Sequence, residues 1–503
     1  MTVIQTKNSV LAIKPETTEG TPVAPTAAGD YIALQDDFTM EPAFDQLENA
    51  ELKASIGKSK SIIGAENPTA SLSHYLRHSG VEGQAPNYKE LLQAAFGGKD
   101  VEAVEYNTIA ASTISLVKVD TGEGANFIRG QALLVKDGTN GYSIRPVHSI
   151  SGDNLTLGFD LENAPAVGIN LGKAATYYPA NSGHQSLSLW HYAGNGGAIQ
   201  LIAGAKVTEF GLEFSAGEMI NGSYSLEGLS YYFDPIEILA ADRYLDFTDD
   251  DGTFAAIITA KIYKDPHDLA SALEAAMNAT GTTETHTVTY SDTTGKFTIA
   301  TSTSTVLSLL WNTGTNTANT VGDKIGFSIA ANDTGATTYT SDNAISFAAP
   351  QTPTYDTADP LAAKDNTVLL GDHDDATCFA AGTVSFSLGN ERAVIPSICA
   401  ESGRGGSIIA SREVTVSVMA IVDKYCADKF KRLRTNADTR FAYVFGTKSG
   451  NNWVPGKCGC LYIPTATIAS FNLTDQDGLF AVELELKAYV DSAGNGEVYL
   501  SFV

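Results

Sequence analysis

The residues that could carry chemistry occur in a few short clusters. Gly403-Arg404-Gly405-Gly406-Ser407 looks like a phosphate-binding loop. Such a loop must lead directly into a helix, because the backbone amides and the helix dipole have to point at the anion. Here Ile408 and Ile409 begin a strand-like run instead. The sequence therefore predicts a turn or an inter-subunit loop at this point.

Cysteine and histidine show no metal-site pattern. One residue separates Cys458 from Cys460, whereas paired zinc ligands usually have two residues between them. In a strand both sulfurs would face the same side, which favours buried structural thiols. His74 and His78 have the ligand spacing of a helix, but residues 71–78 read as a strand. The odd count of five cysteines favours reduced thiols in a cytoplasm.

Two acidic clusters could bind calcium, at Asp246 with Asp249–Asp251 and at Asp372 with Asp374 and Asp375. Neither follows the twelve-residue calcium loop with its closing Glu, so hydrated hairpin turns are the favoured interpretation. The sequence contains no Gly-x-Ser-x-Gly and no His-Glu-x-x-His motif. We therefore predict no catalytic residue, cofactor or metal ligand, and a non-enzymatic protein.

Composition limits the partners and the fold. A chain of 503 residues is too long for one core, and 46 glycines with only 18% charged residues suit many short strands joined by turns. The net charge of −26 argues against a surface that grips nucleic acid. No signal peptide and no apolar run long enough to span a membrane is visible, so we expect no membrane insertion.

Helical patterns are rare. They occur at 88–96, at 426–434 and in a stretch that opens with Asp265-Pro266, an N-cap followed by proline. The remainder alternates between strand-like runs and turn residues.

The most informative feature is an internal repeat. Residues 205–217 align without gaps with 466–478, since 466 − 205 = 478 − 217 = 261. Residues 54–69 align with 400–415, since 400 − 54 = 415 − 69 = 346. Between these anchors each copy reads strand, helix, strand. The smaller second offset places an insertion of 346 − 261 = 85 residues in the first copy.

This repeat divides the chain into six segments. Residues 31–100 with 183–238 form a discontinuous first unit (the N-terminal unit), and 379–503 form the second (the C-terminal unit). We further expect an arm at 1–30, an inserted small β-barrel at 101–182, an inserted α+β decoration module at 239–349 and a linker at 350–378.

Several segments resemble the tail tube (major tail) proteins of long-tailed bacteriophages. They are Glu16–Pro22 with Thr26–Ala28, Tyr88–Gly97, Gly204–Leu212 with Gly217 and Glu218, and the stretch from Gly382 to Val503, which looks like a further copy. The resemblance implies a mainly β fold, with two tail-tube-type β-sandwich or split-barrel units, each with a flanking helix, plus the two inserted β-rich modules.

The resemblance also implies a function. Subunits of this family join edge to edge into rings that stack into a hollow tube for genome delivery. Two units per chain would give a homotrimeric, pseudo-hexameric ring. The implied partners are further copies of the chain, the tape-measure, tail terminator and baseplate proteins, and double-stranded DNA in transit without specific binding. Assembly in the host cytoplasm and a place in the virion tail follow. Alternatives are a baseplate hub or capsid decoration protein, an adhesin-like β-protein and an enzyme with accessory β modules.

Two sets of residues are candidates for assembly and transit. The loops at 47–61 and 394–407 would lie between subunits or rings, and their basic residues could pair with acidic neighbours; charge reversal at Lys58 and Arg404 would test this. The basic residues are Lys53, Lys58, Lys60 and Arg404. Glu483 and Glu485 alternate with apolar residues and are candidates for a face that lines the lumen, with an ordinary outer face as the alternative.

Overall fold

The computed structural model describes residues 6–51, 57–194, 197–347, 349–355, 358–375, 378–421, 426–476, 478–491 and 496–503. The protein is mainly β, as predicted, with helices α1 (Lys89–Phe96), α2 (Pro266–Asn278) and α3 (Cys426–Thr435). These helices confirm the three helical patterns of the sequence. Asp265 caps α2, because its side chain accepts a hydrogen bond from the Asp268 backbone N–H.

The N-terminal unit and the arm before it contribute ten strands. They are β1 (Val10–Pro15), β2 (Tyr31–Ile32), β3 (Thr39–Glu41), β4 (Phe44–Leu47), β5 (Ile62–Glu66), β6 (Thr69–Tyr75), β15 (Leu187–Ala193), β16 (Ala198–Ser215), β17 (Asn221–Glu227) and β18 (Ser230–Phe233). Within the predicted arm, β1 pairs with β15. Leu11, Ala12 and Ile13 of β1 are buried, which explains why this segment joins the sheet.

The C-terminal unit and the segment before it contribute seven strands. They are β28 (Thr367–Gly371), β29 (Ala381–Pro396), β30 (Arg404–Ile421), β31 (Thr439–Ser449), β32 (Asn452–Gln476), β33 (Leu479–Ala488) and β34 (Tyr499–Phe502). β28 lies inside the segment expected to be a linker, yet it pairs with β31. Val368, Leu369 and Leu370 are buried there, so three consecutive apolar residues draw this end of the segment into the sheet.

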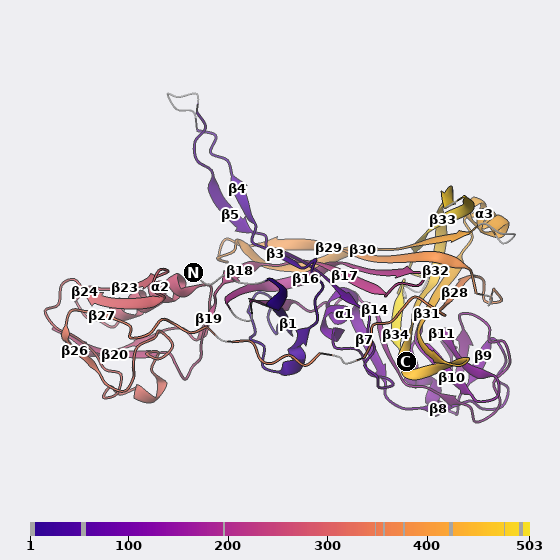
Figure 1. Ribbon diagram of the computed structural model, residues 1–503, viewed down its shortest axis with the longest axis horizontal. Coiled ribbons are helices and arrows are strands. Elements are labelled where there is room, and N and C mark those ends of the chain that lie inside the picture. The colour runs from indigo at the N-terminus through magenta and orange to yellow at the C-terminus, as the bar shows by residue number, and fades with distance from the viewer. Residues whose placement is uncertain are drawn as a thin grey trace.

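Both units belong to one large sheet. Its antiparallel pairings run β3–β6–β17–β16–β29–β30–β33–β32–β31–β28. The link between β16 and β29 joins the two units, and the long strands β29 and β30 run above α1 in Figure 1. α1 lies beneath these strands, and its buried residues share one core with residues of both units.

The inserted segment after α1 divides between two sheets. Its outer strands β7 (Gly97–Glu102) and β14 (Ala174–Pro179) extend the large sheet, because β14 pairs with both β7 and β34. Between them lies a six-stranded sheet of β8 (Tyr106–Asn107), β9 (Leu116–Lys118), β10 (Ala132–Asp137), β11 (Gly141–Ser151), β12 (Asn154–Leu157) and β13 (Asn170–Leu171).

This six-stranded sheet has a core of its own, but it also shares a second core with the C-terminal unit. Ala132, Leu134 and Ile144 pack in the same cluster as Val444 and Tyr462. The insert is therefore anchored against the C-terminal unit, at the right of Figure 1.

The second module projects from the opposite end of the molecule (Figure 1). It packs α2 on its own hydrophobic core, which includes Leu269, Leu273 and Met277. Its strands are β19 (Ile236–Ile238), β20 (Tyr244–Asp249), β21 (Gly252–Ile257), β22 (Lys261–Tyr263), β23 (His286–Ser291), β24 (Lys296–Thr301), β25 (Leu307–Leu309), β26 (Asp333–Ala336) and β27 (Thr338–Thr340). Lys264 ties the module to the N-terminal unit through Glu66, at 2.6 Å.

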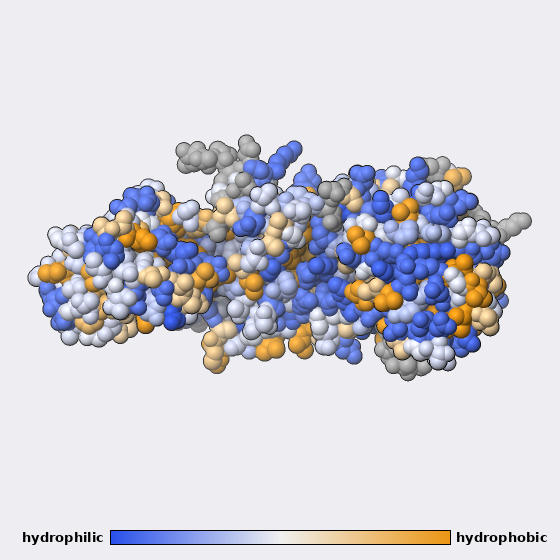
Figure 2. All heavy atoms as spheres, turned by 90° about the horizontal axis from the view of Figure 1, so that it is seen from below, coloured by the Kyte–Doolittle hydropathy of each residue, from blue (hydrophilic) through white to orange (hydrophobic). Residues whose placement is uncertain are grey.

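The face of the molecule that Figure 2 shows is largely hydrophilic. Seen from below, small apolar patches alternate with charged and polar residues (Figure 2). Among the described residues, no helix is long and apolar enough to cross a membrane.

Candidate functional site

The two units have matching strand registers at the first sequence offset. Thr39 of β3 lies opposite Ser71 of β6, and Ser385 of β29 lies opposite Ser417 of β30. The difference is constant, 385 − 39 = 417 − 71 = 346. The hairpin β4–β5 continues this relation, because Gln46 opposes Ile63 as Arg392 opposes Ile409, with 392 − 46 = 409 − 63 = 346.

A shift in strand register also recurs in both units, at the second sequence offset. The β16–β17 register shifts between Val207 and Glu209, and the β32–β33 register shifts between Ile468 and Ser470. The difference is 468 − 207 = 470 − 209 = 261. A bulge adds one residue to one strand and redirects its twist, so a shared bulge position is a specific similarity.

Each unit also places its helix on the sheet through one pair of phenylalanines. Phe96 of α1 contacts Phe210 of β16 edge to face, with ring centroids 5.7 Å apart. Phe430 of α3 contacts Phe471 of β32 in the same way, at 5.6 Å. The strand residues again differ by 471 − 210 = 261. We call residues related by these two offsets equivalent.

The β16–β29 contact is a junction between units within one chain. Seven residue pairs form its register, from Glu209 opposite Gly389 to Ser215 opposite Thr383. Leu212 and Phe214 are 2% exposed there. The buried Asn390 side chain donates hydrogen bonds to the Ala95 carbonyl of α1 (2.9 Å) and the Val207 carbonyl of β16 (3.2 Å).

A buried ion cluster reinforces the junction. Lys206 of β16 lies 3.0 Å from Glu19, and Arg392 of β29 lies 3.9 Å from the same carboxylate. Arg392 also donates to the Ser407 hydroxyl at 2.8 Å. Burial without enough compensation lowers the pKa of Arg392 from its usual value. The arm residue Glu19 thus balances cations that come from both units.

The large sheet turns a polar face away from the α1 core. Hydroxyl and carboxylate side chains predominate along it, because strand residues alternate between the two faces. The set includes Ser71, Glu209, Glu213, Ser223, Ser225, Ser385, Ser387, Glu391, Glu413, Thr415, Ser417, Asn472, Thr474, Glu483 and Glu485. On this face, Lys487 is neutralised by Glu413, with 2.7 Å between Nζ and Oε1.

The two acidic candidates from the sequence lie on this polar face. Glu483 is exposed and Glu485 is half-buried, whereas Val482, Leu484 and Leu486 of β33 are buried. Ser470 of β32 donates to Glu485 at 3.4 Å. Sequence reasoning missed the rest of the polar face, because strands that are far apart in the chain had to be placed side by side.

The basic candidates divide into exposed and covered residues. Lys58 is exposed and lies 3.9 Å from Glu48, and Lys60 is exposed as well. The side chain of Arg404 is 11% exposed and lies 3.9 Å from Asp45 of the hairpin β4–β5. Lys53 lies outside the described residues. Arg404 therefore contacts the N-terminal unit of its own chain.

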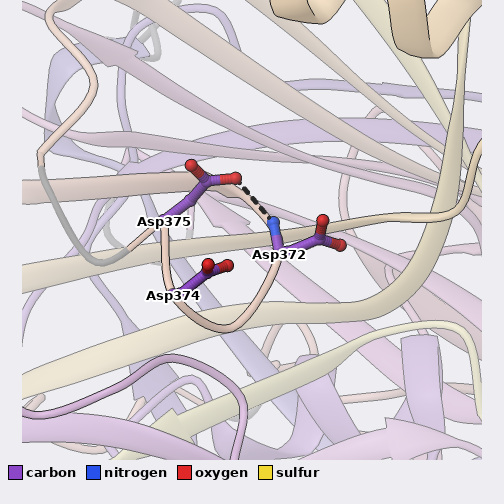
Figure 3. Close-up of side chains that lie close together, drawn as sticks. All are labelled: Asp372, Asp374 and Asp375. Carbon is purple, nitrogen blue, oxygen red and sulfur yellow. Dashed lines mark hydrogen bonds between the residues drawn. The ribbon is translucent and has the colours of Figure 1, made fainter.

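The cluster at the end of β28 is an ion-paired turn (Figure 3). The Asp372 backbone N–H donates to Asp375 at 2.8 Å, while Asp374 is exposed. Arg432 of α3 binds Asp372 at 2.7 Å and lies 3.5 Å from Asp375. The Arg432 guanidinium lowers the pKa of Asp372. The turn thus fastens α3 to β28.

The paired cysteines lie in a core. Cys458 and Cys460 of β32 are buried, and burial raises the pKa of both thiols to about 12. His74 lies in β6 rather than a helix, with its ring 4.2 Å from that of Tyr88. These residues are structural parts of the sheet.

The N-terminal part of the chain matches a known family. Residues 6–234 match the family model described as "Phage tail tube protein". The matched range contains the strands of the N-terminal unit and the inserted six-stranded sheet. No curated protein matches the chain. The matched family is structural rather than enzymatic. Over residues 6–234, this chain is similar to the phage tail tube protein family.

Proposed function

We propose that this protein polymerises into stacked rings that form the hollow tail tube of a bacteriophage, the conduit for genome delivery. The observation that carries the proposal is the β16–β29 junction, which joins two units with matching registers into one continuous sheet. We infer that the chain holds two copies of a tube unit, and that three chains form a pseudo-hexameric ring. Symmetric closure of repeated interfaces is the usual outcome for homo-oligomers.

The polar face of the large sheet would line the lumen. Glu209, Glu213 and Glu483 would repel the phosphates of double-stranded DNA, while the hydroxyl side chains hold water. DNA would then pass without specific binding. The opposite face of the sheet is covered by α1 and the core, and the two inserted modules would point outward.

Stacking of rings would use the projecting hairpin. β4 and β5 extend away from the body in Figure 1 and carry exposed apolar residues. Leu47 is 56%, Ile62 63% and Ile63 64% exposed. Lys58 and Lys60 lie between these two strands, so they would meet acidic neighbours of the next ring. Tape-measure, tail terminator and baseplate proteins would bind the tube in the virion after assembly in the host cytoplasm.

Electron microscopy of the purified protein, averaged along the filament axis, tests this function. We expect hollow tubes of stacked rings, each with three chains and six similar inner lobes. Discrete particles that never stack would overturn the tube in favour of a hub or decoration protein. Six chains per ring would keep the tube and refute the trimer.

A further inference from the structure

The junction inside one chain is a template for the contact between chains. β29 is a middle strand, paired with β16 on one side and with β30 on the other. Its equivalent in the N-terminal unit is β3 with its flanking residues, and the equivalent of the paired part of β16 is residues 470–476 of β32. Among the described residues, these two segments pair on one side only, β3 with β6 and this part of β32 with β33.

The backbone of β3 presents hydrogen-bonding groups to the open side. The Asn67 N–H, two residues before β6, donates to the Ala43 carbonyl at 2.7 Å, and the Gln35 N–H donates to the Ser73 carbonyl of β6 at 3.2 Å. The odd-numbered residues from 35 to 43 therefore direct their backbone groups to the β6 side. Alternate residues of an antiparallel strand face opposite neighbours, which directs the backbone groups of Met40 and Phe38 outward. Pro42 also faces outward and offers its carbonyl alone. An edge of this kind is a ready template for another strand.

At the unpaired edge of the C-terminal unit, apolar side chains are exposed whose equivalents are buried in the internal junction. Leu473 is 62% exposed, whereas its equivalent Leu212 is 2% exposed inside the junction. Phe430 of α3 is 51% exposed, whereas its counterpart Phe96 of α1 is 0% exposed. The same helix-on-strand contact is thus buried in the N-terminal unit, where β29 covers it, and exposed in the C-terminal unit.

The complementary edge carries a matching apolar residue. The position equivalent to Asn390 is Phe44, since 390 − 44 = 346, and Phe44 is 41% exposed. In the template, Asn390 reaches over α1 to the Ala95 carbonyl. Phe44 in that place would lie beside Phe471 and Phe430, so the junction between chains would be apolar where the internal one is polar.

We propose that β3 of one chain pairs antiparallel with β32 of the next, in the register that the internal junction dictates. This inference rests on the proposed ring and names its partner surface. The template pairs Glu213 with Ser385 and Gly211 with Ser387. Adding 261 to the first member and subtracting 346 from the second places Thr474 opposite Thr39 and Asn472 opposite Glu41. Met40 then lies opposite Leu473, on the side of the core.

Disulfide trapping tests the register. Thr39 and Thr474 would be a non-hydrogen-bonded pair, whose Cα atoms lie about 4.5 Å apart and can be bridged. The background variant carries Cys378→Ser and Cys399→Ser, because both thiols are exposed. In assembled tubes, mild oxidation of Thr39→Cys with Thr474→Cys should convert most of the monomer into covalent trimers on a non-reducing gel, and reduction should reverse this.

Two matched variants serve as controls. Glu213→Cys with Ser385→Cys is the equivalent internal pair. It should form a disulfide within one chain, which changes the mobility of the monomer on the non-reducing gel without creating multimers. Thr39→Cys with Asn472→Cys is displaced by two residues, a separation of about 7–8 Å, and should not be trapped. Trapping of the displaced pair in place of Thr39 with Thr474 would overturn the register.

The outcomes separate this inference from the proposed function. If tubes form and the internal pair is trapped but Thr39 with Thr474 is not, the register is wrong and the tube stands. If covalent trimers form but microscopy shows no stacking, the register stands and the tube function fails. Absence of both tubes and trimers would refute both.

Discussion

At the residue scale, Glu19 shows how the arm stabilises the contact between units. Its carboxylate lies beside Lys206 and Arg392, whose side chains are 10% and 1% exposed. Two cations at this depth are costly unless an anion balances them. The short Pro-Glu-Thr-Thr-Glu stretch of the arm thus has a structural role that its composition alone does not reveal.

Replacing Glu19 should therefore be costly. We expect Glu19→Ala to lower the free energy of unfolding by about 3–5 kcal/mol, because Lys206 loses its carboxylate partner and Arg392 keeps only Glu227, at 3.6 Å. The exposed pair Glu48–Lys58 provides the control, and Glu48→Ala should cost less than about 1 kcal/mol. Denaturant or thermal unfolding of the monomer measures both, and similar losses in the two variants would contradict the prediction.

His74 makes the fold sensitive to acid. Burial between Tyr88 and Tyr224 lowers its pKa to about 4, whereas an unfolded histidine has a pKa near 6.5. Between these values the unfolded state binds the proton and the folded state does not. The stability contributed by neutral His74 is therefore present above pH 6.5 and is lost as the pH falls towards 4.

We expect His74→Phe to reduce this acid sensitivity by about 1.4 kcal/mol per pH unit between pH 6 and 4.5. Phenylalanine keeps an aromatic ring between the two tyrosines but cannot be protonated. Unfolding free energies of both proteins across this range give the difference. Parallel pH profiles for the two proteins would show that His74 does not titrate during unfolding.

At the element scale, the equivalent strands β16 and β32 differ in what covers them. Leu212 of β16 is buried in the internal junction, while Leu473 of β32 is exposed. This contrast separates folding from assembly, because each residue can be changed without touching the other.

We expect Leu473→Asp to abolish tube formation while changing the thermal stability of the monomer by less than about 0.5 kcal/mol. The matched variant Leu212→Asp should unfold or strongly destabilise the monomer, because it places a carboxylate in the core. Thermal unfolding and electron microscopy of both variants provide the measurements. Normal tubes from Leu473→Asp would exclude this edge from assembly.

Local patterns predicted the helices and the positions of many strands, but not all of the strand partners. The N-cap Asp265 and the apolar spacing of Leu269, Leu273 and Met277 sufficed to predict α2, because the signals lie within the helix itself. β1 and β28 were missed inside a predicted arm and a predicted linker. Their assignment depends on partners more than 60 residues away, at β15 and β31, and no local pattern encodes such pairing.

The candidate site was predicted only in part for the same reason. Glu483 and Glu485 were visible as an alternating pattern within one strand. The acidic and hydroxyl residues of β16, β17, β29 and β30 join them only because the ladder places these strands side by side. Arg404 lies next to Asp45 of its own chain, a contact that no local pattern reveals, since the turn that carries Arg404 packs on the other unit.

At the scale of the whole molecule, the polar face should govern how DNA moves through a tube. Reversing one charge per chain with Glu213→Lys would place three cations in each three-chain ring. We expect such tubes to retain short double-stranded DNA at low salt, and to release it as salt rises, because phosphate binding depends on counterion release.

Wild-type tubes should not retain the DNA. The charge-matched control is Asp292→Lys, a reversal at an exposed position of the outer α+β module. Tubes of this variant should retain no more DNA than wild-type tubes. Co-sedimentation of labelled DNA with tubes measures retention. Equal retention by the two variants would show that Glu213 does not face the lumen.

The β16–β29 junction also has a consequence for how quickly a ring can begin to form. Each association of free subunits loses translational and rotational freedom, at an estimated cost of 4–15 kcal/mol. In the proposed six-unit ring, every second contact between units would already be made when the chain folds, so three separate molecules would have to meet instead of six. Covalent linkage thus acts as a very high local concentration of the second unit around the first. The proposed ring would then nucleate at lower protein concentration, and it would always contain an even number of units.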